Sequence, residues 1–345
     1  MDISEFDYSL DKKLIAQQPL SRREASKMMI LNRDTGRITH SFFYDFLSFV
    51  SQEYILVLNN TKVFPARLYA HTAEGKEIEV LLVKELTDGV WETMAKPLKK
   101  IKKHATLYFD DGIHSCTVTD FTSRNRLIVT ISPSNDFWDF IERYGKPPLP
   151  PYIKRLSNEY SETDWNRYQT VFAQKTGSIA APTAGFHFSP EILNALQEKN
   201  IHITYITLHV GSATFQPLRV TNITEHTMEN EYFEMSVESF NKIKNAKEAG
   251  KKILAVGTTS VRTIESVDFT RSITESLKGW TNLFIYPGYE FKMTDAMLTN
   301  FHLPKSTLLM LVYAFASKKY MFAAYQEAMQ HEYRFYSYGD CMLIL

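Results

Sequence analysis

Residues 77–96, EIEVLLVKELTDGVWETMAK, contain two short runs rich in aliphatic, β-branched and aromatic residues, separated by the turn formers Asp88 and Gly89. This pattern predicts a β-hairpin. Further runs of the same kind flank the hairpin, at 66–72, 105–111, 114–122 and 126–132. Six short strands at this spacing, with no pattern of a βαβ crossover, predict a small antiparallel β-barrel or sandwich.

On both sides of this segment, buried strand patterns alternate with helical ones, which favours an α/β fold with parallel strands. Helices are expected at 189–200, 238–250, 258–266, 306–316 and 320–333, and strands at 54–60, 201–210, 251–257 and 341–345. A hairpin is expected at 28–40, and a proline-rich linker follows a short helix at 137–145. We therefore predict a large discontinuous α/β domain with a mixed or barrel-like sheet (1–65 and 152–345). A small antiparallel β-barrel domain with the linker (66–151) is inserted into it.

The composition limits the possible partners and cofactors. Lys plus Arg and Asp plus Glu are both 39, so an RNA partner is neither required nor excluded, and RNA-binding positive charge would have to be gathered locally. Cys116 and Cys341 stand outside any metal-binding pattern, which argues against zinc, iron–sulfur clusters and radical chemistry. No signal-peptide pattern is present, and the longest apolar run, 308–316, is much shorter than the roughly 20 residues of a membrane span. We expect a metal-free, cytoplasmic monomer.

Polar residues gather where predicted strands end, which is where open α/β sheets bind ligands. The first cluster is 59–62 with Arg67, which alternatively forms a turn whose Asn side chains bond the backbone. The second is the loop 182–185 with His187, a residue that alternatively is a satisfied core histidine. The third contains His209 and the pair Glu229 and Glu231, whose spacing puts both carboxylates on one face of an extended segment, or leaves them on a solvated edge.

Two further clusters precede helices. Gly257 to Ser260 follow a buried strand and open a helix that carries Arg262, so the free N–H groups of the helix start favour an anionic group. Neither GxxxxGK[ST] nor GxGxxG is present there. Asn300, His302 and Lys305 crowd the start of the helix at 306–316.

A lysine-rich loop interrupts the barrel pattern at residues 96–104, KPLKKIKKH. Its lysines are the candidate phosphate contacts, although an ordinary solvated loop explains them equally well. The candidates are Lys96, Lys99, Lys100, Lys102 and Lys103.

Several segments in this order resemble the S-adenosylmethionine:tRNA ribosyltransferase-isomerase family of queuosine biosynthesis. They are NNTKVFPARL, PTAGFHF, LHVGSATFQPLR, AVGTTSVRTIES, YPGYEFK, TNFHLPKSTLLML and the C-terminal YRFYSYGDCMLIL. The resemblance implies an α/β domain with an inserted β-barrel. It also implies an enzyme that consumes S-adenosylmethionine as a substrate. The ribosyl group would be transferred and isomerised onto 7-aminomethyl-7-deazaguanine at the wobble position of tRNA, giving epoxyqueuosine-tRNA, adenine and methionine.

Such chemistry needs a base for the acidic protons beside the sulfonium, a donor for adenine, and groups that hold the cation. His187, His209 and His302 are the candidates for proton transfer. Glu229 or Glu231, with the rings of Phe186 or Phe188, are the candidates for holding the sulfonium. The residues expected at the substrate are Asn59, Asn60, Thr61, Lys62, Arg67, Thr183, Gly185, Phe186, Phe188, Gly211, Thr214, Arg219, Gly257, Thr258, Thr259, Ser260, Arg262, Asn300 and Lys305.

Two other functions compete with this interpretation. A non-catalytic RNA-binding protein would use the barrel to dock RNA, but it would not need the surplus of polar residues at strand ends. A conventional methyltransferase would release S-adenosylhomocysteine instead of adenine and methionine.

Overall fold

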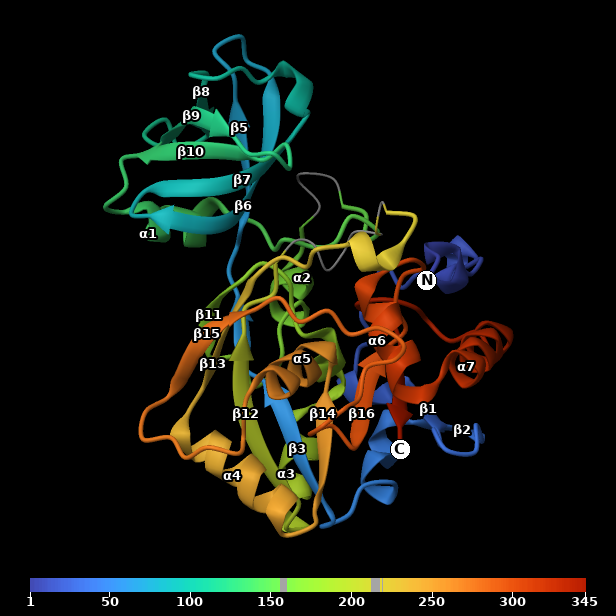
Figure 1. The fold of residues 1–345 in the computed structure, drawn as a ribbon. Coiled ribbons are helices and arrows are strands. Elements are labelled where there is room, and N and C mark those ends of the chain that lie inside the picture. Colours follow the sequence, from blue (N-terminus) through green and yellow to red (C-terminus); the bar gives the residue numbers. More distant parts are fainter. Residues whose placement is uncertain (156–159, 212–217, 219) are drawn as a thin grey trace. The chain divides into compact units, whose positions relative to one another are not determined.

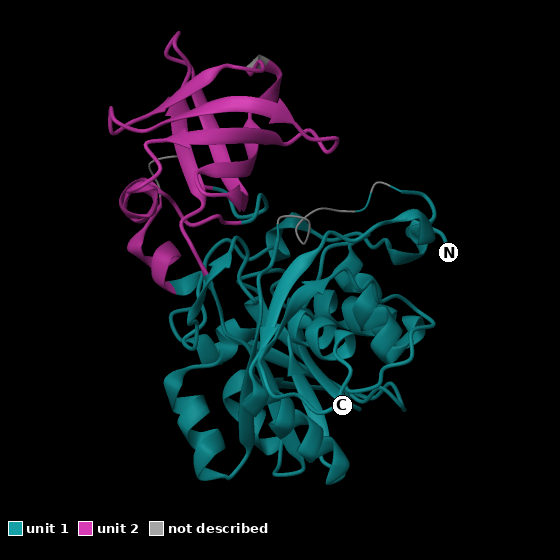
Figure 2. Cartoon of the chain, turned by 60° about the vertical axis from the view of Figure 1, so that its left-hand side comes forward, with its two compact units in different colours: residues 1–62, 150–154, 167–345 teal, residues 63–149, 155–166 magenta. Residues whose placement is uncertain are grey.

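A computed structural model describes residues 1–155, 160–211, 218 and 220–345, together with the backbone but not the side chain of Lys100. The described chain divides into two compact units (Figure 2). The larger unit contains residues 1–62, 150–154 and 167–345, and the smaller unit contains residues 63–149 and 155–166. Among the described residues, no helix has the length and apolar character that crossing a membrane requires.

A nine-stranded mixed sheet forms the centre of the larger unit (Figure 1). β12, β3, β14 and β16 run parallel to one another, and antiparallel strands extend the sheet at both ends. In spatial order the strands are β15 (Leu277–Thr281), β13 (Glu231–Met235), β12 (His202–Leu208), β3 (Tyr54–Asn59), β14 (Lys252–Val256), β16 (Ala296–Asn300), β17 (Cys341–Ile344), β1 (Lys27–Leu31) and β2 (Ile38–Phe42).

Helices cover both faces of this sheet, so its central strands are buried on both sides (Figure 1). Ile55 and Val57 of β3 point into the core shared with α4, α5, α6 and α7, while Leu56 and Leu58 point into the core shared with α3. Strands buried in this way consist of continuous apolar runs, which is the pattern of β3 and β14. The helices are α3 (Pro190–Glu198), α4 (Val237–Glu248), α5 (Thr258–Ser266), α6 (Thr307–Ala316) and α7 (Lys318–Gln330).

Side-chain caps fix where two of these helices begin. The Ser189 hydroxyl accepts the N–H of Ile192 at 3.4 Å and begins α3, and the Ser306 hydroxyl accepts the N–H of Leu309 at 3.2 Å and begins α6. Both serines were predicted as N-caps or helix starts from the sequence, because a side-chain oxygen there satisfies one of the orphan N–H groups of the first turn.

The smaller unit is built on a closed six-stranded antiparallel barrel in the order β10-β7-β6-β5-β8-β9. Alternate residues of its strands face the core, as in β9, where Cys116 and Val118 are fully buried. Its strands are β5 (Arg67–His71), β6 (Glu77–Thr87), β7 (Val90–Lys96), β8 (Thr106–Phe109), β9 (Ser115–Phe121) and β10 (Leu127–Ser132). The smaller unit also contains α1 (Phe137–Tyr144) and, up to residue 166, α2 (Glu162–Arg167). A separate two-stranded sheet of β4 (Thr61–Val63) and β11 (Lys175–Ser178) consists, except for Val63, of residues of the larger unit.

The predicted fold class is confirmed, with a mixed α/β sheet and a closed antiparallel barrel. The sequence did not reveal β15 or β16, and it did not predict the antiparallel pairing of β16 with β17. β15 is half exposed and contains Gly279, which weakens the strand pattern, and β16 was read only as the approach to a helix.

Candidate active site

One cavity of the larger unit lies where β12, β14 and β16 end at the carboxyl edge of the sheet. It encloses about 540 Å³ of space that no atom fills, including the part open to solvent. We call it the strand-end cavity. Its lining consists of Tyr152, Ala181, Pro182, Thr183, Ala184, Val210, Gly257, Thr258, Thr259, Thr299, Asn300, Phe301, His302, Leu303, Leu308, Tyr336 and Ser337. All of these side chains are uncharged at neutral pH, because burial keeps His302 neutral.

Three of the five predicted polar clusters contribute to this lining. The second cluster supplies Thr183. The fourth supplies Gly257, Thr258 and Thr259 from the end of β14, and the fifth supplies Asn300 and His302 from the end of β16.

The start of α5 forms one wall of the cavity. Gly257 precedes the helix with a φ of 86°, a left-handed conformation that glycine adopts without strain. Thr259 is 8% exposed, and its Oγ1 has no hydrogen-bond partner within the part of the chain that the structure describes. A buried hydroxyl without a partner is costly, so Thr259 is the lining residue with the strongest need for a polar group from a ligand.

His302 is held in the wall as a neutral imidazole. Its Nε2 lies 2.8 Å from the Thr299 hydroxyl, and its backbone N–H donates to the Tyr325 hydroxyl at 2.8 Å. Burial lowers the pKa of His302 to about 3. The ring is therefore uncharged at neutral pH and can exchange hydrogen bonds with a ligand, but it is a weak base.

His187 lies behind the cavity in a chain of buried hydrogen bonds. Its Nδ1 is 2.7 Å from the Ser26 hydroxyl and its Nε2 is 3.4 Å from Oδ1 of Asn300, which itself donates to the Tyr336 carbonyl at 3.0 Å. Burial lowers the pKa of His187 to about 3, although the bond to Asn300 acts in the opposite direction. The His187 ring is therefore better suited to orienting Asn300 than to the predicted role in proton transfer.

The first predicted cluster, at the end of β3, has its hydrogen bonds satisfied inside the protein. Oδ1 of Asn59 accepts the N–H groups of Thr61 and Leu208 at 3.1 and 3.0 Å, and its amide donates to the Leu208 carbonyl at 3.0 Å. The Thr61 hydroxyl lies 2.8 Å from Nδ1 of His209. None of these side chains is among the cavity lining, which matches the alternative interpretation of a structured turn.

Carboxylate oxygens of Glu231 and Glu229 both lie near Gly211. A Cβ placed on Gly211 would be 3.9 Å from Oε1 of Glu231 and 4.0 Å from Oε2 of Glu229. Glu231 accepts the Gly211 N–H at 2.9 Å and forms a buried ion pair with Arg262. Because both of its oxygens are used, Glu231 fixes the backbone at Gly211 and is not an open base.

The remaining predicted residues are dispersed. Phe188 and Ser260 are fully buried, Gly185 packs against Phe172 and Thr170, Phe186 lies against Arg23, and Asn60 accepts from Thr207. Lys62 is exposed, and Lys305 pairs with Asp7 at 2.8 Å. Arg67 belongs to the smaller unit, where it lies 3.2 Å from Glu79. Thr214 and Arg219 lie outside the described residues.

In the smaller unit, the predicted RNA-binding loop is exposed. Lys96 ends β7, and Lys99, Lys102 and Lys103 follow it with exposed side chains. Lys103 also pairs with Asp120 at 3.2 Å, so part of its charge is already neutralised. The loop therefore offers cationic groups to solvent.

Sequence reasoning missed the aromatic and hydroxyl residues of the lining that come from outside the strand ends. Tyr152 follows the proline-rich linker, and Tyr336 and Ser337 precede β17. For Tyr336 and Ser337, the signal was the C-terminal YRFYSYGD motif, which contributed to the resemblance but was not assigned to the site.

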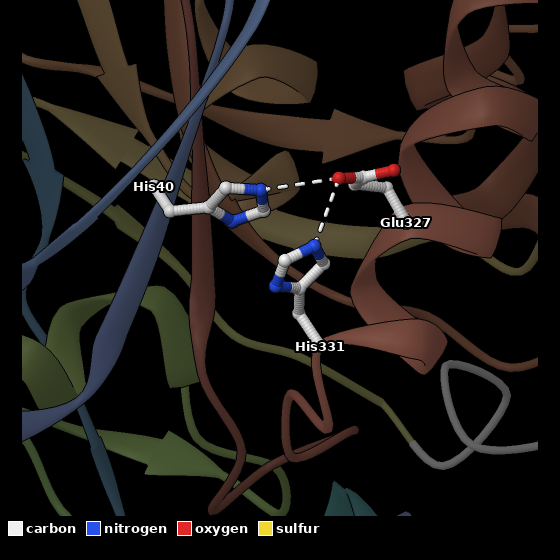
Figure 3. Close-up of side chains that lie close together, drawn as sticks. All are labelled: His40, Glu327 and His331. Atoms are coloured by element: carbon white, nitrogen blue, oxygen red, sulfur yellow. Dashed lines mark hydrogen bonds and ion pairs between the residues drawn. The ribbon is translucent and has the colours of Figure 1, made fainter.

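A separate group on the surface of the larger unit combines two histidines and a glutamate (Figure 3). Oε1 of Glu327 lies 3.3 Å from Nε2 of His40 and 3.0 Å from Nε2 of His331, and the two imidazole rings stack at 4.3 Å. Side chains of these types can hold a metal ion. Hydrogen bonds and ion pairs between β2 and the end of α7 account for the same arrangement without one.

A large mixed sheet with a cavity at the carboxyl ends of its parallel strands places the protein in the α/β class, in which ligands bind at this edge. Within that class, the chain belongs to the queuosine biosynthesis protein family, whose model matches residues 3–344. The resemblance seen in the sequence is thereby confirmed, as is the assignment to a transferase of this pathway.

Relatives match over the whole length. The chain is 48% identical to the S-adenosylmethionine:tRNA ribosyltransferase-isomerase of Halothermothrix orenii, with 100% of both chains covered. It is 44% identical to that of Staphylococcus epidermidis, again with 100% of both covered. A crystal structure of S-adenosylmethionine tRNA ribosyltransferase from Thermotoga maritima is 37% identical, covers 99% of this chain and 100% of its own, and superposes with a TM-score of 0.56.

Proposed function

We propose that this protein is an S-adenosylmethionine:tRNA ribosyltransferase-isomerase. It transfers and isomerises the ribosyl group of S-adenosylmethionine onto 7-aminomethyl-7-deazaguanine at the wobble position of a tRNA. The products are epoxyqueuosine-tRNA, adenine and methionine. The full-length similarity to relatives with this name carries the proposal, because it extends over both units of the chain.

The strand-end cavity is the proposed binding site of S-adenosylmethionine. Its uncharged lining suits a nucleoside, and Thr258, Thr259 and Asn300 offer hydroxyl and amide groups to the sugar and base. Tyr152, Phe301 and Tyr336 supply aromatic residues to the same lining, and aromatic faces attract a sulfonium cation without a full ion pair.

The histidines of the site act as neutral hydrogen-bonding groups in this proposal. His302 belongs to the lining, and its low pKa keeps the ring uncharged, so it can donate to or accept from a ring nitrogen of the adenine leaving group. His187 holds Asn300 in place from behind. A base with a pKa of about 3 contributes little to proton abstraction, since efficiency falls when the pKa lies far below the working pH.

Glu229 is proposed to lie close to the sulfonium and its acidic protons. A Cβ placed on Gly211 would be 4.0 Å from Oε2 of Glu229, and Gly211 adjoins the lining residue Val210. Replacing Glu229 by Gln should lower the rate of adenine release while leaving the free energy of unfolding nearly unchanged. Unchanged adenine release would remove Glu229 from the mechanism.

The exposed lysines of the barrel unit are proposed to contact tRNA phosphates. With no net charge on the chain, Lys96, Lys99 and Lys102 provide a local concentration of positive charge on one loop. The proposal needs only that this loop reaches the RNA in the complex.

Product analysis tests the reaction directly. The protein is incubated with S-adenosylmethionine labelled in the adenine and methionine parts and with tRNA that carries the aminomethyl base. Release of both adenine and methionine, with label entering the tRNA, is the expected result. S-adenosylhomocysteine as the product would indicate a methyltransferase, and tight RNA binding without consumption of the sulfonium substrate would indicate a non-catalytic RNA-binding protein.

A further inference from the structure

A second cavity of the larger unit adjoins the strand-end cavity and has the opposite chemical character. It encloses about 280 Å³ of unfilled space, and three arginines line it: Arg23, Arg167 and Arg334. They come from a short 3₁₀ helix near the N-terminus (Arg23–Ala25), the end of α2 and the segment before β17. We call this the arginine pocket. Ser337 lines both cavities, and His187 of the arginine pocket is 3.4 Å from Asn300 of the strand-end cavity.

The backbone holds two of the guanidinium groups in fixed positions. Arg23 donates to the carbonyls of Phe186 and Gln169 at 3.2 and 2.9 Å, and its guanidinium lies over the Phe186 ring. Arg167 donates to the carbonyls of Leu20 and Ser21 at 2.6 and 3.1 Å. Carbonyl oxygens orient a guanidinium but do not neutralise its charge.

The positive charge of the pocket exceeds the negative charge beside it. Asp340 is within 3.2 Å of Arg334 and also accepts backbone N–H groups of Arg334 and Lys27, so it is fully used. Glu24, which is near Arg167, forms its ion pair with Arg22 at 2.7 Å. Burial, and then the charge of the nearby Arg167, lower the pKa of Arg23 to about 10. The Nε of Arg167 is buried without a hydrogen-bond partner among the described residues.

We infer that the arginine pocket binds a phosphate group of the polynucleotide substrate, next to the nucleotide that reacts. This inference deepens the proposed function and depends on it for the identity of the polynucleotide. Arginine groups in a fixed geometry bind phosphate oxygens through paired N–H donors. Ser337 lines both cavities and His187 contacts Asn300, so a phosphate in the arginine pocket would lie beside the proposed S-adenosylmethionine site.

The carboxylate of S-adenosylmethionine is the other oxyanion in the reaction, and the pocket suits it less well. That carboxylate is joined to an ammonium group, which the guanidinium groups would repel. No carboxylate side chain belongs to the described lining of the pocket to receive the ammonium. A phosphodiester brings one negative charge and no cation.

Binding and kinetics of Arg167→Gln and Arg23→Gln test the inference. Binding is measured with an unmodified anticodon stem–loop RNA, which does not react, at several salt concentrations. Each variant should raise the Kd for this RNA at least tenfold, and the slope of log Kd against log salt should fall by about 0.7 for the lost contact. In the reaction, KM for tRNA should rise by a similar factor while KM for S-adenosylmethionine stays within about twofold.

Controls separate binding from folding. Arg37→Gln removes an exposed arginine of the β1–β2 turn and should leave the Kd and the salt slope unchanged. Arg23→Lys and Arg167→Lys retain the charge, and they should restore the salt slope while recovering only part of the affinity. Thermal unfolding of every variant shows which variants are folded. If a glutamine variant does not fold, the corresponding lysine variant is used for the test.

The outcomes distinguish the alternatives. A rise in KM for S-adenosylmethionine with unchanged RNA binding would assign the pocket to the amino-acid carboxylate and overturn the inference. Folded variants with unchanged binding of both substrates would make the arginines structural and also overturn it. Because the RNA measurement needs no turnover, it remains valid even if the wild-type protein fails to release adenine, which would count against the proposed function alone.

Discussion

The end of β3 and the ends of β14 and β16 carry similar polar residues on the same sheet but use them differently. At the end of β3, Asn59 and Thr61 bond the backbone or a neighbouring side chain. After β14 and β16, Thr259 and His302 line the strand-end cavity, and the Thr259 hydroxyl has no partner among the described residues. The same sequence signal therefore marks a structural turn in one place and the proposed binding site in the other. The partner of each polar atom distinguishes them.

The largest effect should follow from Asn59→Ala, which tests the structural side of this comparison. The change leaves two buried N–H groups and one carbonyl without their partner, so the free energy of unfolding should fall by about 3 kcal/mol. Urea unfolding measures the loss. The kcat/KM of the folded fraction should change less than about threefold. A large loss of kcat/KM with full stability would instead place Asn59 at the substrate.

His302 should give the protein an acid sensitivity that its replacement removes. Its pKa is about 3 in the folded protein and near the ordinary 6.5 in the unfolded chain, so only the unfolded state binds the proton between these values. The contribution of His302 to the free energy of unfolding is therefore fully present above pH 6.5 and is lost as the pH decreases toward 3. For this one group, the loss between pH 7.5 and pH 5 should be about 2 kcal/mol.

Urea unfolding at the two pH values checks this expectation. His302→Asn should reduce the difference between pH 7.5 and pH 5 by about the stated amount, whatever its effect at pH 7.5. His202→Asn, at an exposed position of β12, is the matched control and should leave the difference unchanged. An unaltered pH difference in His302→Asn would mean that the ring is not held neutral in the folded protein.

Thr259→Val tests the binding side of the comparison with a smaller effect. The change replaces a hydroxyl that has no internal partner by a methyl group, so stability should stay within about 0.5 kcal/mol or rise. The loss of a hydrogen bond to the substrate should lower kcat/KM about tenfold. Thr263→Val is the matched control one turn further along α5, because its hydroxyl already donates to the Thr259 carbonyl at 2.9 Å. That variant should lose stability and keep its kcat/KM.

The sequence predicted the elements whose patterns are local. The six barrel strands alternate apolar and polar residues between clear turns. Ser189 and Ser306 are N-cap residues that mark the starts of α3 and α6. Polar residues at strand ends also predicted part of the cavity lining, such as Thr258 and Asn300. Their use could not be predicted, because Asn59 finds its partners near residue 208, far along the chain. Contacts of this range depend on the folded sheet and leave no local pattern.

The arginine pocket illustrates the same limit. Arg23, Arg167 and Arg334 are far apart in the sequence, and none stands in a basic run of the kind that identified the lysine loop. Their proposed common function depends on three segments that meet only after folding. The lysine loop, in contrast, is visible in the sequence because its charges are neighbours.

The smallest expected effect concerns that loop and extends the comparison from buried polar atoms to exposed charges. Lys99→Gln with Lys102→Gln should weaken binding of the anticodon stem–loop RNA only a few-fold at physiological salt. The slope of log Kd against log salt should fall by about 0.7 for each lysine that contacts a phosphate. Lys242→Gln with Lys278→Gln removes two exposed lysines of the larger unit and serves as the control. An equal decrease of the slope in both double variants would show that the RNA responds to net charge alone. Because exposed charges hold no fixed geometry, the loop should add affinity without selecting the nucleotide, which leaves selection to the two cavities.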